Sequence, residues 1–280
     1  MLIQFRFKNF KSFRDDTILD LSATKITEHS DRVISAGYDK LLPTAAIFGA
    51  NASGKSNVIE AFRYMTTYVI EFFSYGGDPN DRKTKNKKLK YTPFLFDSAS
   101  RDAESSFEVY FMGTEERGYK SYNYGFTLNQ DGVIEEWLNS KAKTAREYKQ
   151  VFYRNGDELD LSGLPTKSQE LIRISLNKEA LIVSLGAKLK VTKLKSIRDW
   201  FYNTNFTNFG NPYENVFLSS LIPEGFAENK SVQDKVVAYF SSFDSSIIGF
   251  HTEVLKGEDE DHRHAKIDAI HCMVNGGAAS

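Results

Sequence analysis

Hydrophobic and polar residues alternate at the start of the chain. Apolar Ile3, Phe5 and Phe7 are separated by polar residues throughout residues 3–8. A period of two places every second side chain on the same face, so this stretch predicts a β-strand with one buried face. The same alternation recurs more briefly over residues 19–21 and predicts a second strand.

The apolar spacing changes around residue 49. Residues 41–48 form a short apolar run that ends at Gly49, which is typical of a buried central strand. After Ser56 the apolar residues recur every three or four positions, which predicts a helix that stops near residues 76–77. The residues of its apolar face are Ile59, Phe62, Met65, Val69 and Phe73.

The middle of the chain returns to a period of two, and its last third is mainly helical. Alternation predicts strands at residues 107–111, 122–128 and 133–138, with a turn at Asp131-Gly132, so we expect an antiparallel sheet. A polar, lysine-rich connection at residues 78–92 precedes it. The spacing then predicts four helices and a final strand, at residues 167–176, 178–189, 192–203, 231–243 and 245–254.

Composition places the chain among ordinary globular proteins. Its 280 residues are 41% hydrophobic and 26% charged, and no apolar run approaches the ~20 residues that span a bilayer. The single cysteine, Cys272, suits a reducing compartment, so we expect a cytoplasmic protein that does not bind membranes. A net charge of -1 gives the whole chain no attraction to nucleic acid, and any DNA contact would need a local patch.

One motif carries recognisable phosphate chemistry. Residues 49–56 fit the P-loop pattern G-x-x-x-x-G-K-[ST] in full, between the predicted strand and helix. Its residues are Gly49, Ala50, Asn51, Ala52, Ser53, Gly54, Lys55 and Ser56. Glycines let the backbone wrap around phosphate oxygens, Lys55 supplies a positive charge to the β- and γ-phosphates, and Ser56 is the expected ligand of Mg²⁺. We therefore expect ATP and Mg²⁺ as ligands.

The surroundings of the P-loop resemble a known group of proteins. The letters FKNFKSF at residues 7–13, then the P-loop with Asn57, then Glu60-Ala61, resemble ABC-type ATPases of the SMC, RecF and OLD group. Within that group the chain is most similar to AAA-15/AAA-21 ATP-binding proteins, which include the RloA-like abortive-infection ATPases that act against phage. The similarity is specific over residues 1–61 and extends more loosely over the other stretches, which are residues 93–94, 107–111, 122–128 and 136–138.

The resemblance implies a fold and additional site residues. The fold is an α/β P-loop NTPase of ABC-ATPase type, a first lobe with an antiparallel β subdomain and a helical insertion. It implies that Lys11 approaches the nucleotide, that Asn51 lies near the γ-phosphate, and that Asn57 completes the nucleotide-binding set with Lys55 as the catalytic residue. An exposed strand-end lysine is the alternative for Lys11. The glutamine that such ATPases place near the nucleotide is not assigned, because Gln130 and Gln150 both lie at plausible distances and neither has a distinctive context.

Two elements that hydrolysis requires are not recognisable downstream of the P-loop. The nearest acidic pair to a Walker B strand is Glu135-Glu136, preceded by only two apolar residues, and no signature loop is found. We therefore expect the N-terminal part of such an ATPase. Its expected parts are a nucleotide-binding lobe (1–162), a helical insertion (163–244), and a return strand and tail (245–280) that ends before the signature loop.

The function that follows is ATP binding and hydrolysis coupled to phage defence or DNA maintenance. The expected partners are a second copy of the chain, in a homodimer or higher oligomer, and a nuclease-like effector protein. A nucleotide-binding regulatory module without turnover is the alternative, and a nucleoside or small-molecule kinase is disfavoured because an Arg-rich lid is missing. Two other clusters of residues give weaker indications of function. The spacing of His262, His264, His271 and Cys272 fits no zinc pattern, and the lysines at 83–90 are typical of a solvated loop.

Overall fold

A computed structural model describes most of the chain. The described residues are 1–26, 28–36, 39–75, 89–115, 118–208, 210–213, 226, 229–242, 247–256, 263–272 and 278–279. Contacts divide the chain into two compact units, residues 1–206 and residues 207–280, and each is described here by itself. The expected three-part organisation, with an insertion between residues 163 and 244, stays a prediction.

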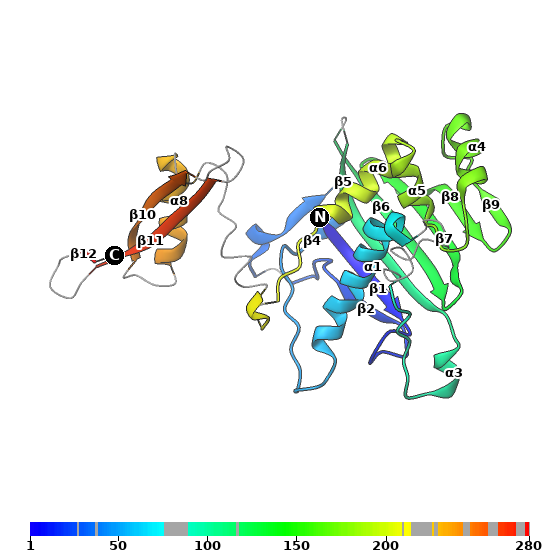
Figure 1. Cartoon of the computed structure of the whole chain (residues 1–280), viewed down its shortest axis with the longest axis horizontal. Coiled ribbons are helices and arrows are strands. Elements are labelled where there is room, and N and C mark those ends of the chain that lie inside the picture. Colours follow the sequence, from blue (N-terminus) through cyan, green and yellow to red (C-terminus); the bar gives the residue numbers. More distant parts are fainter. Residues whose placement is uncertain are drawn as a thin grey trace. The chain divides into compact units, whose positions relative to one another are not determined.

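The first unit is built on a seven-stranded sheet in which every neighbouring pair is antiparallel (Figure 1). Its spatial order is β2-β1-β5-β6-β7-β8-β9. The strands are β1 (Leu2–Lys8), β2 (Thr17–Asp20), β5 (Ser105–Glu115), β6 (Gly118–Asn129), β7 (Gly132–Ala142), β8 (Lys149–Asn155) and β9 (Glu158–Asp160). The short pair β3 (Ile34–Ala36) and β4 (Asp39–Leu41) forms a separate hairpin, and η1 (Ser30–Arg32) precedes it.

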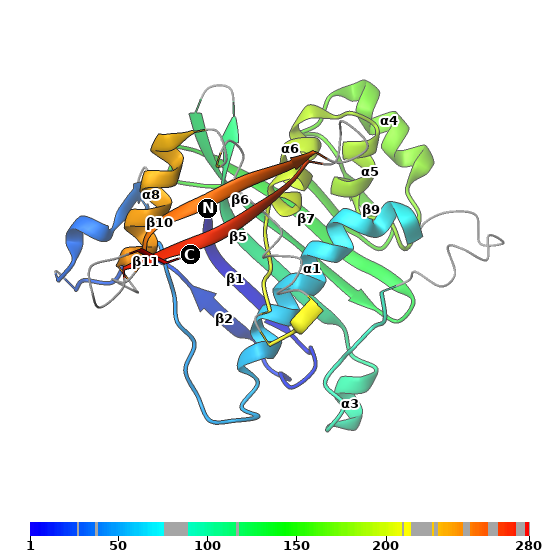
Figure 2. The same ribbon diagram turned by 60° about the vertical axis from the view of Figure 1, so that its left-hand side comes forward.

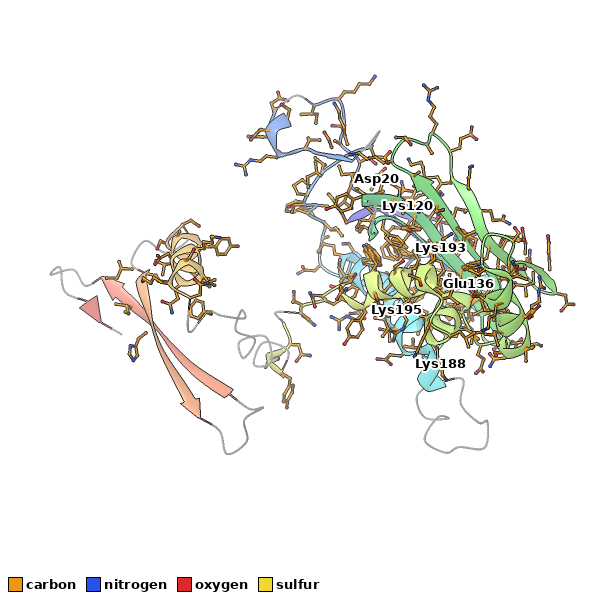
Figure 3. All side chains as sticks on the ribbon, turned by 90° about the horizontal axis from the view of Figure 1, so that it is seen from above. Asp20, Lys120, Glu136, Lys188, Lys193 and Lys195 are labelled. Atoms are coloured by element: carbon orange, nitrogen blue, oxygen red, sulfur yellow. The ribbon has the colours of Figure 1, made fainter. Side chains whose placement is uncertain are left out.

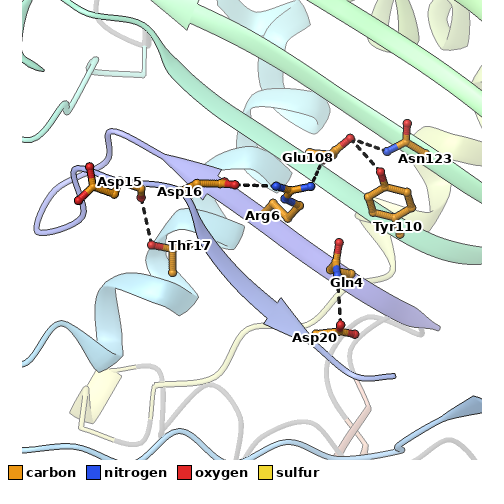
Figure 4. Close-up of polar contacts among 9 residues, drawn as sticks. All are labelled: Gln4, Arg6, Asp15, Asp16, Thr17, Asp20, Glu108, Tyr110 and Asn123. Carbon is orange, nitrogen blue, oxygen red and sulfur yellow. Dashed lines mark hydrogen bonds and ion pairs between the residues drawn. The ribbon is translucent and has the colours of Figure 1, made fainter. Parts of the chain in front are cut away.

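Alternation along β1 separates an apolar face of the sheet from a polar one. Phe5 and Phe7 are fully buried, as the sequence predicts. Arg6 points to the opposite face, where it bonds Asp16 at 2.6 Å and lies 3.8 Å from Glu108 (Figure 4). The Glu108 carboxylate in turn accepts hydrogen bonds from Asn123 and Tyr110, and the Gln4 amide donates to Asp20. Arg6 and Asp16 remain partly exposed, so this network pairs charges on a face that contacts water and contributes modestly to stability.

Helices cover the apolar face of the sheet (Figure 2). They are α1 (Lys55–Tyr75), α4 (Thr166–Ser175), α5 (Ile182–Lys188) and α6 (Thr192–Tyr202), and the short α3 (Ser98–Arg101) precedes β5. Helices α1, α4, α5 and α6 lie close to the predicted segments, although α5 begins later than expected. The indole of Trp200 on α6 stacks on Phe111 of β5 with ring centroids 4.0 Å apart. Helix and sheet therefore share one core that is rich in aromatic rings.

The segment that leads into the P-loop differs from its prediction. The sequence predicts a buried strand over residues 41–48, but β4 ends at Leu41 and residues 42–50 are irregular. Leu41 is buried, whereas Phe48 is 89% exposed. A buried strand needs neighbours that satisfy its backbone N–H and C=O groups, and no strand among the described residues pairs with residues 42–48. The prediction of a central strand here is wrong.

The second unit contains a small sheet and one helix. Strands β10 (Ile247–Lys256), β11 (Arg263–Cys272) and β12 (Ala278–Ala279) pair in that order and antiparallel. β10 confirms the strand predicted at 245–254, and α8 (Lys230–Ser241) confirms the last predicted helix. The Asn229 side chain caps α8 by accepting hydrogen bonds from the backbone N–H groups of Ser231 and Val232.

Several expectations fall on residues outside the described ranges. The lysine-rich connection at 78–92 is described only from residue 89, and the side chain of Phe73 is not described. His262 also lies outside, and in the described ranges no group of three or more His, Cys, Asp or Glu side chains is arranged to hold a metal ion.

No helix in the described part of the chain combines the length and the apolar character needed to cross a bilayer.

One buried carboxylate ties the helical layer to the sheet. Glu136 of β7, labelled in Figure 3, is fully buried and accepts hydrogen bonds from the Tyr124 hydroxyl at 3.0 Å and from two backbone N–H groups at the start of α5. Those donors belong to Ile182, at 2.6 Å, and Val183, at 3.2 Å. Burial raises the pKa of Glu136 to about 7, although these donors and the nearby Arg154 guanidinium favour the charged form.

The raised pKa of Glu136 predicts a pH-dependent stability. The folded protein binds the Glu136 proton more tightly than a carboxyl group with the ordinary pKa of 4.5 does. The stabilisation that results is fully present below pH 4.5 and is lost as the pH rises through about 7. Glu136→Gln removes the titration. Its free energy of unfolding relative to wild type should increase between pH 5 and pH 7, by at most about 1 kcal/mol per pH unit. Urea unfolding of both proteins at pH 5, 6, 7 and 8 measures this, and a constant difference would contradict it.

Candidate nucleotide-binding site

The P-loop curves because two of its residues adopt left-handed backbone angles. Ala52 has a φ of 62° and Gly54 a φ of 91°, and the loop then runs directly into α1, which begins at Lys55. The backbone N–H of Ser53 bonds the carbonyl of Ala50 at 3.3 Å and closes a turn inside the loop. Changes of backbone hand of this kind turn successive N–H groups toward one concavity, which suits an anion.

Space is tight at both fixed glycines of the motif. A Cβ on Gly49 would lie 2.7 Å from the Ser53 hydroxyl, and a Cβ on Gly54 would lie 2.8 Å from the Ser12 hydroxyl. Gly54 also needs a positive φ that L-residues rarely adopt. The two glycines therefore allow the close approach of the backbone that phosphate binding needs.

The Lys55 ammonium group turns back over its own loop. Its Nζ donates to the carbonyl of Gly49 at 2.7 Å and to that of Ala50 at 2.6 Å. Among the residues that the structure describes, no carboxylate lies within ion-pair distance of it. Within the described part of the chain, the Lys55 cation is therefore solvated by two carbonyl oxygens and not paired with an anion.

Ser56 and Asn57 occupy the first turn of α1 beside Lys55. Ser56 is exposed, and its neighbour Asn57 donates through Nδ2 to the hydroxyl of Ser12 at 2.8 Å. The phenyl ring of Phe13 lies against the same part of the loop, 3.1 Å from the position of a Cβ on Gly54. The turn after β1 is thus in direct contact with the P-loop and with the start of α1.

Lys11 lies on this turn and reaches α1. Its Nζ is 3.8 Å from a carboxylate oxygen of Glu60, which is one helical turn beyond Ser56 and therefore on the same face of the helix. Both side chains are more than a third exposed, so the pair contributes little to stability. It does place a positive charge beside the helix face that carries Ser56. Approach of Lys11 to a nucleotide stays a prediction.

The other candidate residues have partners elsewhere in the first unit. Glu136 is bound to the start of α5, and Glu135 accepts a hydrogen bond from Tyr153 at 2.7 Å. Gln150 donates to Asp160 at 2.7 Å, and Gln130 is exposed in the β6–β7 turn. The spacing of residues along the sequence did not indicate these hydrogen bonds.

Two residues near the loop were not singled out by the sequence. Ser12 bonds Asn57, and Asn9 is buried at the base of the same turn. Both belong to the FKNFKSF stretch, and an asparagine before a tight turn is a signal for a left-handed backbone.

Comparison with family models gives a match over this region. Residues 45–178 match the family AAA_21, described as "AAA domain, putative AbiEii toxin, Type IV TA system". Residues 45–178 are therefore similar to an AAA_21 domain. The matched range contains the whole P-loop, α1 and the strands β5 to β9, which supports a nucleotide-binding module of ATPase type. Comparison with curated proteins gives no match.

The surroundings of two glycines predict different losses of stability when each is replaced by alanine. Gly54→Ala should lower the free energy of unfolding more than Gly156→Ala. Both glycines have a positive φ, but a Cβ on Gly54 meets Ser12 and Phe13, whereas a Cβ on Gly156 meets nothing within 4 Å. The left-handed backbone alone costs about 1 kcal/mol, and crowding adds to it at Gly54. Equal losses in denaturant unfolding would show that the turn yields freely.

Proposed function

We propose that the P-loop binds ATP with Mg²⁺. The Lys55 ammonium carries this proposal, because it lies on the carbonyls of Gly49 and Ala50 without a carboxylate partner in the described part of the chain. Phosphate oxygens are charged acceptors and form stronger hydrogen bonds with an ammonium than carbonyls do. Exchange of these two carbonyls for phosphate oxygens is therefore favourable.

Other residues of the site have roles that follow from their positions. Backbone N–H groups of the P-loop other than that of Ser53, and those of the start of α1, hold phosphate oxygens, because the first N–H groups of a helix have no partner within it. Ser56 in the first turn of α1 is the protein ligand of Mg²⁺, which neutralises charge on the β- and γ-phosphates. Asn51 lies near the γ-phosphate, and Asn57 and Lys11 border the nucleotide.

The biological role that we propose is phage defence, or DNA maintenance, driven by ATP binding and hydrolysis in the cytoplasm. The family description names a toxin of a type IV toxin–antitoxin system, which supports a defence role for this domain. We propose a homodimer or higher oligomer as the active form, with a nuclease-like effector as a partner.

A regulatory module that binds ATP without hydrolysing it is the second candidate. It is favoured by the engagement of Glu135 with Tyr153 and of Glu136 with the α5 backbone, because neither carboxylate is then available to polarise a water molecule. Phosphate release from ATP by the purified protein separates the two candidates. Turnover that disappears in Lys55→Ala supports the ATPase, and ATP binding without turnover supports the regulatory module.

Lys55→Ala should abolish ATP binding and leave the fold intact. The substitution removes the only charged group of the P-loop, while the side chain is only partly buried and contributes little to the core. Lys193→Ala is the matched control, because Lys193 also donates to a backbone carbonyl, that of Gly163 at 3.5 Å, but lies on α6. Calorimetric titration with ATP measures both affinities. Equal ATP affinity in Lys55→Ala and wild type would refute the assignment of the site.

Ser56→Ala should weaken ATP binding much more in magnesium than in EDTA. The hydroxyl is proposed to contact the metal, so its removal matters only when the metal is present. Ser53→Ala is the control inside the same loop, and its effect should not depend on magnesium. The same loss for Ser56→Ala in both solutions would assign Ser56 a structural role instead.

A further inference from the structure

Asn9 stands where β1 ends and the turn toward the P-loop begins. Its side chain is 2% exposed, and its backbone has a φ of 53° in the left-handed region. Asparagine and aspartate adopt this region more readily than other residues that carry a side chain. Position 9 therefore combines a backbone requirement with a polar group that is fully removed from water.

The Asn9 amide uses both of its ends. Its Nδ2 donates to three carbonyls of the segment that precedes β5, those of Ser100, Ala103 and Glu104, at 2.8, 3.1 and 3.2 Å. Its Oδ1 accepts from the backbone N–H of Phe94 at 2.9 Å. A carboxylate lacks the donor and an aliphatic side chain lacks both, so only an amide satisfies this set of contacts.

Main-chain bonds attach the rest of the turn to the same segment. Phe10 and Phe13 exchange backbone hydrogen bonds at 2.8 and 2.9 Å, which closes a tight turn around residues 11 and 12. The N–H of Lys11 donates to the carbonyl of Thr92 at 3.0 Å, and the Ser105 hydroxyl donates to the carbonyl of Asn9 at 2.5 Å. Residues 9–14, which we name the β1 turn, are therefore held from one side by residues 92–105.

The other side of the β1 turn meets the nucleotide loop. Ser12 accepts the hydrogen bond from Asn57, and Ser12 and Phe13 fill the space beside Gly54. Lys11 extends from the same turn to Glu60 on α1. Asn9 is thus two to four positions along the β1 turn from the residues that contact the P-loop and α1.

We propose that Asn9 is a positioning residue of the nucleotide site, which acts through Lys11 and Ser12. Its amide fixes the β1 turn so that the Lys11 ammonium and the Ser12 hydroxyl stay against the P-loop and the first turns of α1. Without it, both groups lose their fixed distance from the bound phosphates, and the loop loses the contact that supports Gly54. This inference rests on the proposed binding of ATP at the P-loop.

Asn9→Asp tests the proposal with little change in shape. The variant keeps the size of the side chain and the tolerance for a left-handed backbone, but places an oxygen opposite three carbonyl oxygens. Its affinity for ATP with Mg²⁺ should fall about tenfold or more. Asn9→Gly, which keeps the backbone freedom and buries no charge, should show the same direction and replaces Asn9→Asp if that protein does not fold.

Asn123→Asp is the matched control. Asn123 is also a buried amide, 5% exposed, that donates to Glu108 at 2.8 Å and accepts from Asn139 at 2.9 Å, but it lies on β6 and has no bond to the β1 turn. It should lose stability in urea unfolding and keep its ATP affinity within about twofold of wild type. A parallel loss of affinity in both variants would mean that Asn9 matters only for stability, and would overturn the proposal.

A double-mutant cycle separates positioning from general destabilisation. In a Lys11→Ala, Ser12→Ala background, Asn9→Asp should change ATP affinity by less than about threefold, because the groups that it positions are gone. An undiminished tenfold effect in that background would overturn the role through Lys11 and Ser12. If wild type itself binds no ATP, the proposed function fails and this inference with it; if wild type binds ATP and Asn9→Asp binds equally well, only the inference fails.

Discussion

The packing of α1 on the apolar face of the sheet is the constraint on which the position of the P-loop depends. Ala61, Met65 and Val69 of α1 are fully buried against the sheet and its neighbouring helices. The loop continues directly into this helix, so it cannot shift unless the helix leaves the core. Burial of side chains such as Met65 and Val69 stabilises by about 1–3 kcal/mol each, which holds the helix against the sheet. A rigid helix thus supports a loop that is itself exposed.

The two faces of the sheet contribute to the site in different ways. Aromatic rings on the covered face bring Phe10 against Phe107 and Tyr64, with centroids 5.6 and 5.3 Å apart, and so seat the β1 turn beside α1. On the opposite face, Arg6 of β1 forms ion pairs with Asp16 and Glu108. The strand can therefore end at Asn9 with a fixed orientation. Apolar packing sets where the turn lies, and hydrogen bonds set its shape.

Periodicity in the sequence predicted the elements whose patterns are local. The spacing of apolar residues predicted β1, the three long strands β5 to β7, and the helices α1, α4, α5, α6 and α8. All of these except α8 bury apolar side chains. The P-loop followed from a motif with fixed spacing. The hairpin of β8 and β9 was missed, although Gly156-Asp157 between Asn155 and Glu158 is a recognised two-residue turn. Val151 and Phe152 are adjacent and both buried, so the apolar residues of β8 do not alternate with polar ones at that point.

The remaining features depend on contacts that sequence spacing does not encode. The apolar run of residues 41–48 has the composition of a central strand, but composition does not supply the neighbouring strands. Asn9 is separated by about ninety residues from the carbonyls that it binds, and Glu136 by about forty-five from the start of α5. The sequence alone indicates the P-loop, but not the residues that hold it in place.

The order of the strands has a consequence for how the protein acquires its site during folding. The β6–β7 pairing closes through neighbouring residues, Asn129 with Gly132, whereas β1 must find β5 across a hundred residues, Phe7 with Phe107. Closing a long loop costs more entropy than closing a hairpin, so local hairpins form sooner than distant pairs. The β1 turn, and with it the support of the P-loop, is then assembled in a late step. A chain still emerging from the ribosome would carry the phosphate motif long before it could hold a nucleotide in a defined geometry.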